Sequence, residues 1–211
     1  MTETGNSWAD WSETAFGTPY EVWHDGLDLN RAAAAYAVNP EEAEPMLLQG
    51  IALHDALAPK VVDAVLAQGH AVPELVSALK TSHDQGGWDF AIASAVALYR
   101  ATREDSWDGW LLRAMREGPS WTIRIDAAIA LRDFAPSPAR IEALAAAVHD
   151  PDYLVRYHAG TTLLRYAGDA SDIADLPVFK EILDEPPTDA RARFASASAL
   201  LAAQATEALS G

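Results

Sequence analysis

One alternation runs through most of this sequence: a helix-period run, a short turn rich in Pro, Gly and Asp, and a second helix-period run. The second runs begin at Trp88, Trp121 and Tyr153, at spacings of 33 and 32 residues. A small residue follows each aromatic residue after six positions, and a leucine follows after ten. Small residues and leucines one turn apart are what close helix packing requires. The recurrence therefore predicts stacked helix pairs that share one core.

The pattern predicts an all-α protein, an α-solenoid of about five stacked antiparallel helix pairs over residues 39–211. Alanine, the strongest helix former, dominates the apolar residues. The predicted helices are 40–57, 60–68, 73–82, 88–103, 106–117, 121–134, 138–148, 153–167, 175–184 and 189–208. In the last of them we expect the pattern to continue at Arg193, Ser196 and Leu200. Residues 1–38, acidic and rich in Trp, are predicted to form a separate N-terminal helical arm.

Two of the repeats resemble a known family. The segment 150–159 has an acidic turn, then Val155-Arg156, then Ala159 at helical spacing, with Leu163-Leu164 after it. This is similar to the second half of a HEAT repeat in its short bacterial form, which bilin lyases share. The segment 121–131 is a second copy, and the looser resemblance covers about residues 73–203. It implies HEAT-type repeats with a recognition surface and says little about chemistry.

The charge of the chain restricts its partners. The formal net charge is −16, and residues 1–59 hold ten acidic residues against one basic residue, Arg31. Such a field repels phosphate backbones and anionic membranes, so we expect no nucleic-acid and no membrane partner. Solubility alone is a sufficient reason for the acidity. There is no Cys, which excludes disulfides and thiolate sites, and no secretory signal pattern, so a cytoplasmic location is expected.

A column of arginines has two interpretations. Arg124, Arg156 and Arg193 occupy matching places three residues into the second helices or their equivalent. The HEAT resemblance implies a structural ladder, in which each Arg pairs with an acid of a turn or a neighbouring repeat. The alternative is an exposed anion-binding stripe, because an Arg fork suits either use.

Aromatic residues suggest a binding groove. The candidate binding residues are Trp88, Trp121, Tyr153, Tyr157, Asp126 and His158, with Trp23 and His24 from the N-terminal arm. Aromatic walls with a few polar groups describe a ligand pocket or a protein hot spot, whereas buried Trp packing is the structural alternative. His158 with Asp126 is the only weak catalytic candidate. His24, Asp25 and Asp28 could ligate a cation, but no metal and no cofactor is expected, since no further ligand has the required spacing.

The leading functional hypothesis is a non-enzymatic binding or adaptor protein that holds a protein or peptide on its concave surface. A basic partner, as for an immunity-type or antitoxin-type inhibitor, is one version. The alternative is a protein or tailoring enzyme that holds a small apolar ligand in the aromatic groove, as the similarity to bilin lyases allows. No catalytic motif distinguishes the two.

Overall fold

The computed structural model describes all residues except 1–6, 18–19, 21–23, 25, 184–189 and 211. Every regular element within the described residues is a helix, and successive helices pack in pairs, so the all-α, HEAT-like solenoid prediction is confirmed. The chain divides into two compact units, residues 1–107 and 108–211, which are described separately below.

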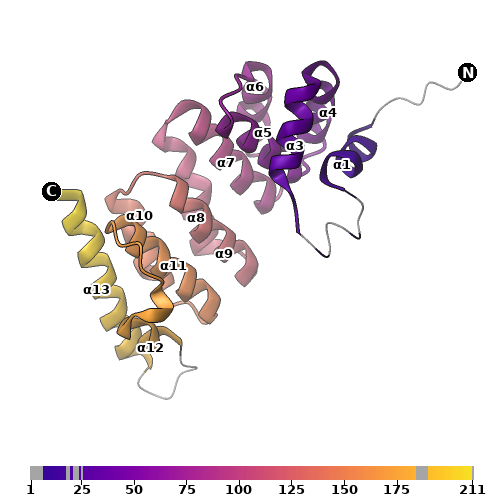
Figure 1. The fold of residues 1–211 in the computed structure, drawn as a ribbon. Coiled ribbons are helices and arrows are strands. Elements are labelled where there is room, and N and C mark those ends of the chain that lie inside the picture. The colour runs from indigo at the N-terminus through magenta and orange to yellow at the C-terminus, as the bar shows by residue number, and fades with distance from the viewer. Residues whose placement is uncertain (1–6, 18–19, 21–23, 25, 184–189, 211) are drawn as a thin grey trace, which may run out of the picture. The chain divides into compact units, whose positions relative to one another are not determined.

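The N-terminal unit contains six of the described helices (Figure 1). They are α1 (Trp8–Phe16), α3 (Leu29–Val38), α4 (Pro40–Ala52), α5 (Leu57–Ala67), α6 (Pro73–Ser82) and α7 (Trp88–Thr102). The C-terminal unit contains α8 (Gly109–Glu117), α9 (Trp121–Ala130), α10 (Pro138–Ala147), α11 (Tyr153–Tyr166), α12 (Pro177–Leu183) and α13 (Ala190–Ser210). Short 3-10 turns lie at Asp105–Asp108, Leu131–Asp133 and Ile173–Asp175.

Helix α1 packs on α3 and α4, and its aromatic side chains enter the core of the N-terminal unit. Trp8 and Trp11 are buried. The Trp8 backbone N–H donates to the Gln49 side chain, and its indole Nε1 donates to Asp55 at 2.8 Å. A Cβ at Gly50 would lie 2.8 Å from the Trp8 ring, so only glycine permits this approach. The boundary predicted after residue 38 falls inside this unit.

The break between α4 and α5 comes earlier than predicted. The sequence predicted one helix to Leu57 and a break at Ala58-Pro59, but α4 ends at Ala52 and α5 begins at Leu57. His54 adopts a φ of 55°, and the Asp55 carboxylate accepts the Leu57 N–H at 2.9 Å. Pro59 lies in the first turn of α5, where a missing N–H costs no helical hydrogen bond. The predicted break at Ala58-Pro59 was therefore wrong in position: the turn at residues 53–56 ends α4, and Pro59 lies inside the first turn of α5 and not before it.

In the C-terminal unit, contacts at both ends show that α9 and α11 run parallel. Near their starts, Arg124 of α9 pairs with Asp150 in the turn before α11. Near their ends, the Tyr166 hydroxyl donates to the Leu131 carbonyl at 2.6 Å, and the Thr162 hydroxyl donates to the Ala128 carbonyl at 2.8 Å. Equivalent positions of consecutive repeats therefore lie side by side, as the period predicts.

The small residues and leucines of the repeat are buried in the first three second helices, but the predicted pair in the last repeat is not. The buried set includes Ser94, Leu98, Ala127, Leu131, Ala159 and Leu163. In α13, however, the predicted Ser196 and Leu200 are exposed, whereas Ala197 and Leu201 are buried. The predicted register of the last repeat was wrong by one residue. The buried positions 194, 197, 198, 201 and 205 of α13 follow a regular helical stripe.

No helix in the described part of the chain has both the length and the apolar character needed to cross a bilayer.

Candidate functional site

The second helices of the C-terminal unit present two large aromatic side chains to solvent. Trp121 and Tyr153 are 47% and 48% exposed. Each is the first residue of its helix, directly after a capping residue: Ser120 accepts the Ile123 N–H, and Asp152 accepts the Leu154 N–H. Because α9 and α11 run parallel, the two aromatic residues lie at the same end of adjacent helices.

One turn further along α11, Tyr157 and His158 are half-buried. The Tyr157 hydroxyl and Asp172 are 3.3 Å apart, and its ring meets the His158 ring edge-on with centroids 5.1 Å apart. Arg132 Nη2 lies 2.9 Å from His158 Nδ1. Since a guanidinium only donates, Nδ1 accepts, and the imidazole is neutral with its proton on Nε2. Burial, and then the Arg132 charge, lower the pKa of His158. Its acid–base role with Asp126, an exposed residue of α9, stays a prediction.

The remaining candidates of the predicted groove lie in the N-terminal unit. Trp88 is half-buried at the start of α7. Trp23 lies outside the described residues, as does Asp25 of the predicted cation-binding turn. His24 is exposed and its ring stacks on Tyr20 with centroids 5.9 Å apart. Within the C-terminal unit, the structure places the candidates of α9 and α11 on two adjacent parallel helices.

Two arginines of the predicted column are held by the repeats. Arg124 donates to both carboxylate oxygens of Asp150, at 2.6 and 3.1 Å, and to the Gly118 carbonyl at 2.9 Å. The Asp150 hydrogen bond raises the pKa of Arg124.

Arg156 is buried, and its guanidinium donates to three carbonyl oxygens: Ile182 at 2.7 Å, Asp150 at 2.7 Å and Pro151 at 2.9 Å. It also lies 4.5 Å from the centre of the Phe194 ring. Arg193 is half-buried, and its role stays a prediction.

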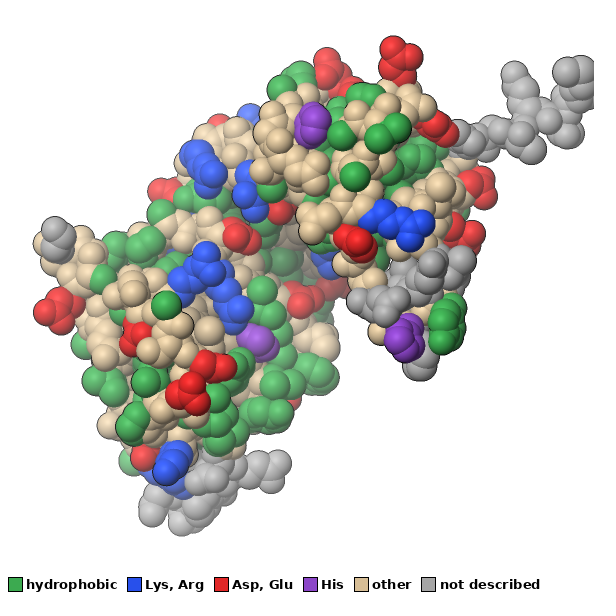
Figure 2. Space-filling view, in the orientation of Figure 1, with side chains coloured by type: hydrophobic (Ala, Val, Ile, Leu, Met, Phe, Trp, Pro, Cys, Tyr) green, Lys and Arg blue, Asp and Glu red, His purple; other side chains and the backbone are tan. Residues whose placement is uncertain are grey.

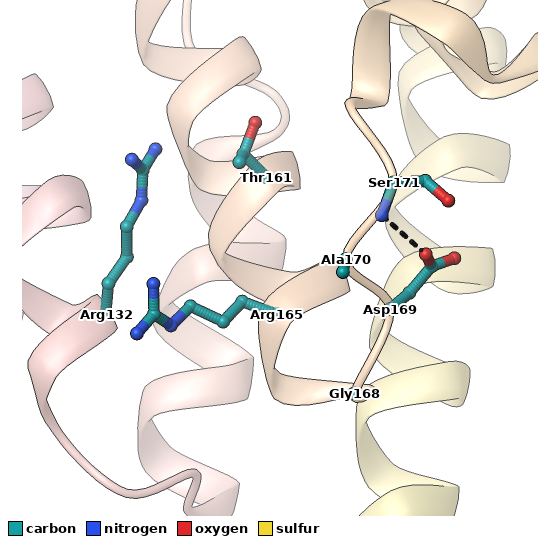
Figure 3. Close-up of a pocket in the computed structure, with 7 residues that line it drawn as sticks. All are labelled: Arg132, Thr161, Arg165, Gly168, Asp169, Ala170 and Ser171. Carbon is teal, nitrogen blue, oxygen red and sulfur yellow. Dashed lines mark hydrogen bonds between the residues drawn. The ribbon is translucent and has the colours of Figure 1, made fainter.

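Sequence reasoning missed a second set of arginines. Arg132 and Arg165, with Thr161 and the loop 168–171, line a depression of about 390 Å³ at the C-terminal end of α11 (Figure 3). Figure 2 shows basic side chains gathered on one face of the C-terminal unit, beside a histidine. A signal was present: Arg100, Arg132 and Arg165 are spaced by 32 and 33 residues, one repeat each.

Comparison with known proteins agrees with the fold. The paired helices define a helical-repeat protein of the solenoid class. A family model for HEAT repeats matches residues 109–201, which is most of the C-terminal unit. This part of the chain therefore consists of HEAT repeats, and the resemblance seen in the sequence is confirmed. Searches of curated proteins and of solved structures returned no match.

Proposed function

We propose that this protein is a non-enzymatic binding protein that holds a protein or peptide partner against α9 and α11. The observation that carries the proposal is the exposure of Trp121 and Tyr153 at equivalent places of consecutive HEAT repeats. Trp and Tyr are enriched in binding hot spots because they combine a large apolar area with a polar tip. Helical repeats commonly offer such extended surfaces to other proteins.

Exposure at these two positions is hard to explain by folding alone. The rest of the repeat signature, at Ala127, Leu131, Ala159 and Leu163, is buried in the core. An exposed Trp contributes little to stability, but in an interface it can bury a large apolar area. The aromatic pair therefore favours a recognition role over a structural one.

Charge supplies the finer part of the proposal. The net charge of −16 favours a partner with a positively charged surface, whose approach the field would accelerate at low salt. Aromatic contacts would then set the lifetime of the complex. Salt should slow association more than it changes dissociation.

The test is quantitative affinity purification from the native cell. Bait proteins would be the wild type, the double variant Trp121→Ala/Tyr153→Ala, and the control Val38→Ala/Leu53→Ala. The control removes apolar side chains that are 86% and 65% exposed in the N-terminal unit. We expect at least one protein that the wild type and the control retain and the aromatic double variant loses.

An unchanged set of captured proteins with the aromatic variant would reject the binding face. A partner that all three baits capture only at low salt would also reject it, because charge attraction alone would then hold the partner and the aromatic residues would have no role. Circular dichroism of each variant checks that the helices remain folded.

A further inference from the structure

The depression beside α11 contains two positive charges that no carboxylate neutralises. Neither Arg132 nor Arg165 has an ion-pair partner among the described residues. The equivalent residue one repeat earlier, Arg100, pairs with both carboxylate oxygens of Asp63. At this place in the repeat, the charge of an arginine can therefore be neutralised by a carboxylate. The two equivalent arginines of the C-terminal unit have no such ion pair among the described residues.

Both arginines line the same depression. In Figure 3 the Arg165 side chain extends along the depression toward Arg132. Burial, and then the charge of Arg165, lower the pKa of Arg132. The nearby acid Asp133 acts on Arg132 more weakly than Arg165 does. Like charges in one depression cost free energy unless an anion lies between them.

Arg132 is also held in place before any ligand arrives. Its Nε donates to the Thr162 hydroxyl at 3.2 Å and its Nη2 donates to His158. Its Nη1 has no acceptor within the described residues, and neither does any side-chain nitrogen of Arg165. A positioned guanidinium loses less entropy when it binds a ligand, which favours a site over a mobile surface charge.

One acid lines the depression, and it is turned away. Asp169 accepts the Ser171 N–H at 2.8 Å, and in Figure 3 its carboxylate points away from both guanidinium groups. Hydrogen bonds from Ser171 lower the pKa of Asp169, so it is charged at neutral pH. Because the Asp169 carboxylate is bound to Ser171, it forms no ion pair with either arginine, and the guanidinium donors stay available to a ligand.

We propose that Arg132 and Arg165 form an oxyanion-binding site for a phosphate group, either free phosphate or a phosphate monoester. A phosphate offers several acceptor oxygens and up to two negative charges, which suits two guanidinium forks in one open depression. Thr161 and the loop 168–171 form the walls. Trp121 and Tyr153 are not among the residues that line the depression.

The test is a titration of the full-length protein with sodium phosphate at constant ionic strength, followed by NMR of the arginine Nε–Hε groups. In about 0.15 M salt the screening length is about 8 Å, so distant acids of the chain oppose binding little. We expect saturable shifts of the Arg132 and Arg165 signals. Phenyl phosphate, titrated in the same way, distinguishes a monoester from free phosphate as the preferred ligand, and preference for either supports the site.

Matched variants decide whether the site is specific. Arg165→Gln removes an exposed charge that makes no hydrogen bond or ion pair within the described residues, so folding should be unaffected. We expect it to weaken phosphate binding about tenfold, as loss of one charge-assisted contact would. Arg116→Gln, an exposed arginine of α8, is the control and should change binding by less than about twofold.

Two results would overturn the site. One is a phosphate response that does not saturate and is equal at all arginines. The other is an equal loss of binding in Arg116→Gln and Arg165→Gln, because the effect would then be one of net charge alone.

Discussion

The two compact units contain similar helix pairs, but different chemistry joins the helices. Residues 1–107 have 16 acidic and five basic residues, and residues 108–211 have 15 acidic and ten basic residues, nine of them Arg. In the N-terminal unit, Trp8 and Trp11 fill the core. In the C-terminal unit, Arg140 and Arg156 are buried, and they are the only arginines buried among the described residues.

The buried arginines of the C-terminal unit donate hydrogen bonds to backbone carbonyl groups that lie outside regular helical hydrogen bonding. The last carbonyl groups of a helix have no partner within it, and a chain of short helices has many of them. In the C-terminal unit arginine supplies such donors: Arg156 reaches the Ile182 carbonyl in the last turn of α12. Arg140 reaches the Ala135 carbonyl in the loop before α10 and the Asp108 carboxylate before α8. One buried arginine thereby connects neighbouring repeats. In the N-terminal unit, Trp8 and Trp11 of α1 instead pack in the hydrophobic core with residues of α3 and α4.

The largest effect should come from the aromatic core of the N-terminal unit. Trp8→Ala removes a buried ring and the hydrogen bond to Asp55. We expect the free energy of unfolding of this unit to fall by about 3–5 kcal/mol. Hydrogen exchange measured by mass spectrometry reports each unit separately. Val38→Ala, at an exposed position, is the control, and a similar loss there would contradict the role of Trp8 packing.

A slightly smaller effect is expected at Arg156, one of the two buried arginines of the C-terminal unit. Arg156→Met keeps an apolar chain of similar length but leaves three carbonyl oxygens without their donor. We expect a loss of about 2–4 kcal/mol, confined to the C-terminal unit. Urea unfolding and hydrogen exchange measure it, with Arg116→Met as the exposed control. A loss below about 0.5 kcal/mol would mean that packing, and not the arginine, joins these repeats.

The Arg124–Asp150 pair should contribute less, because its side chains are 18% and 9% exposed and not fully buried. A double-mutant cycle with Arg124→Met and Asp150→Asn should give a coupling of about 1–2 kcal/mol. The same cycle for the exposed pair Arg113–Glu117 should give about 0.3–0.5 kcal/mol and should fall with added salt. Equal coupling energies for the two pairs would contradict the prediction that the Arg124–Asp150 contact between repeats is stronger than a surface ion pair.

The smallest effect is a pH dependence at His158. The folded state lowers the pKa of His158, so below pH of about 6.5 the unfolded chain binds this proton more readily than the folded one. The stability contribution is therefore present at neutral pH and is lost as the pH falls. His158→Asn keeps an acceptor for Arg132 and cannot titrate. We expect hydrogen exchange in α9 and α11 to depend less on pH in this variant, and an identical pH dependence would contradict the assignment of a neutral His158.

Local rules allowed the sequence to predict the helix pairs, the buried Ala127–Leu131 and Ala159–Leu163 positions, and the HEAT repeats of residues 109–201. They failed at two places: the start of α5, which lies at Leu57 and not at residue 60, and the register of α13, where Leu201 and not Leu200 is buried. A turn stabilised by a local hydrogen bond, such as that from the Leu57 N–H to Asp55, can shift a helix boundary by several residues while the apolar pattern of the flanking helices stays the same.

The sequence by itself determined the class of fold, because helical periodicity and a repeat of about 33 residues are properties of neighbouring residues along the chain. Only the tertiary structure decided which arginines are held by carbonyl groups and acids, and which two line one depression. Arg124 and Arg132 lie eight residues apart, and Arg124 meets Asp150 while Arg132 meets His158. That choice depends on the distances between repeats, which the packing of whole helices sets and no local pattern contains.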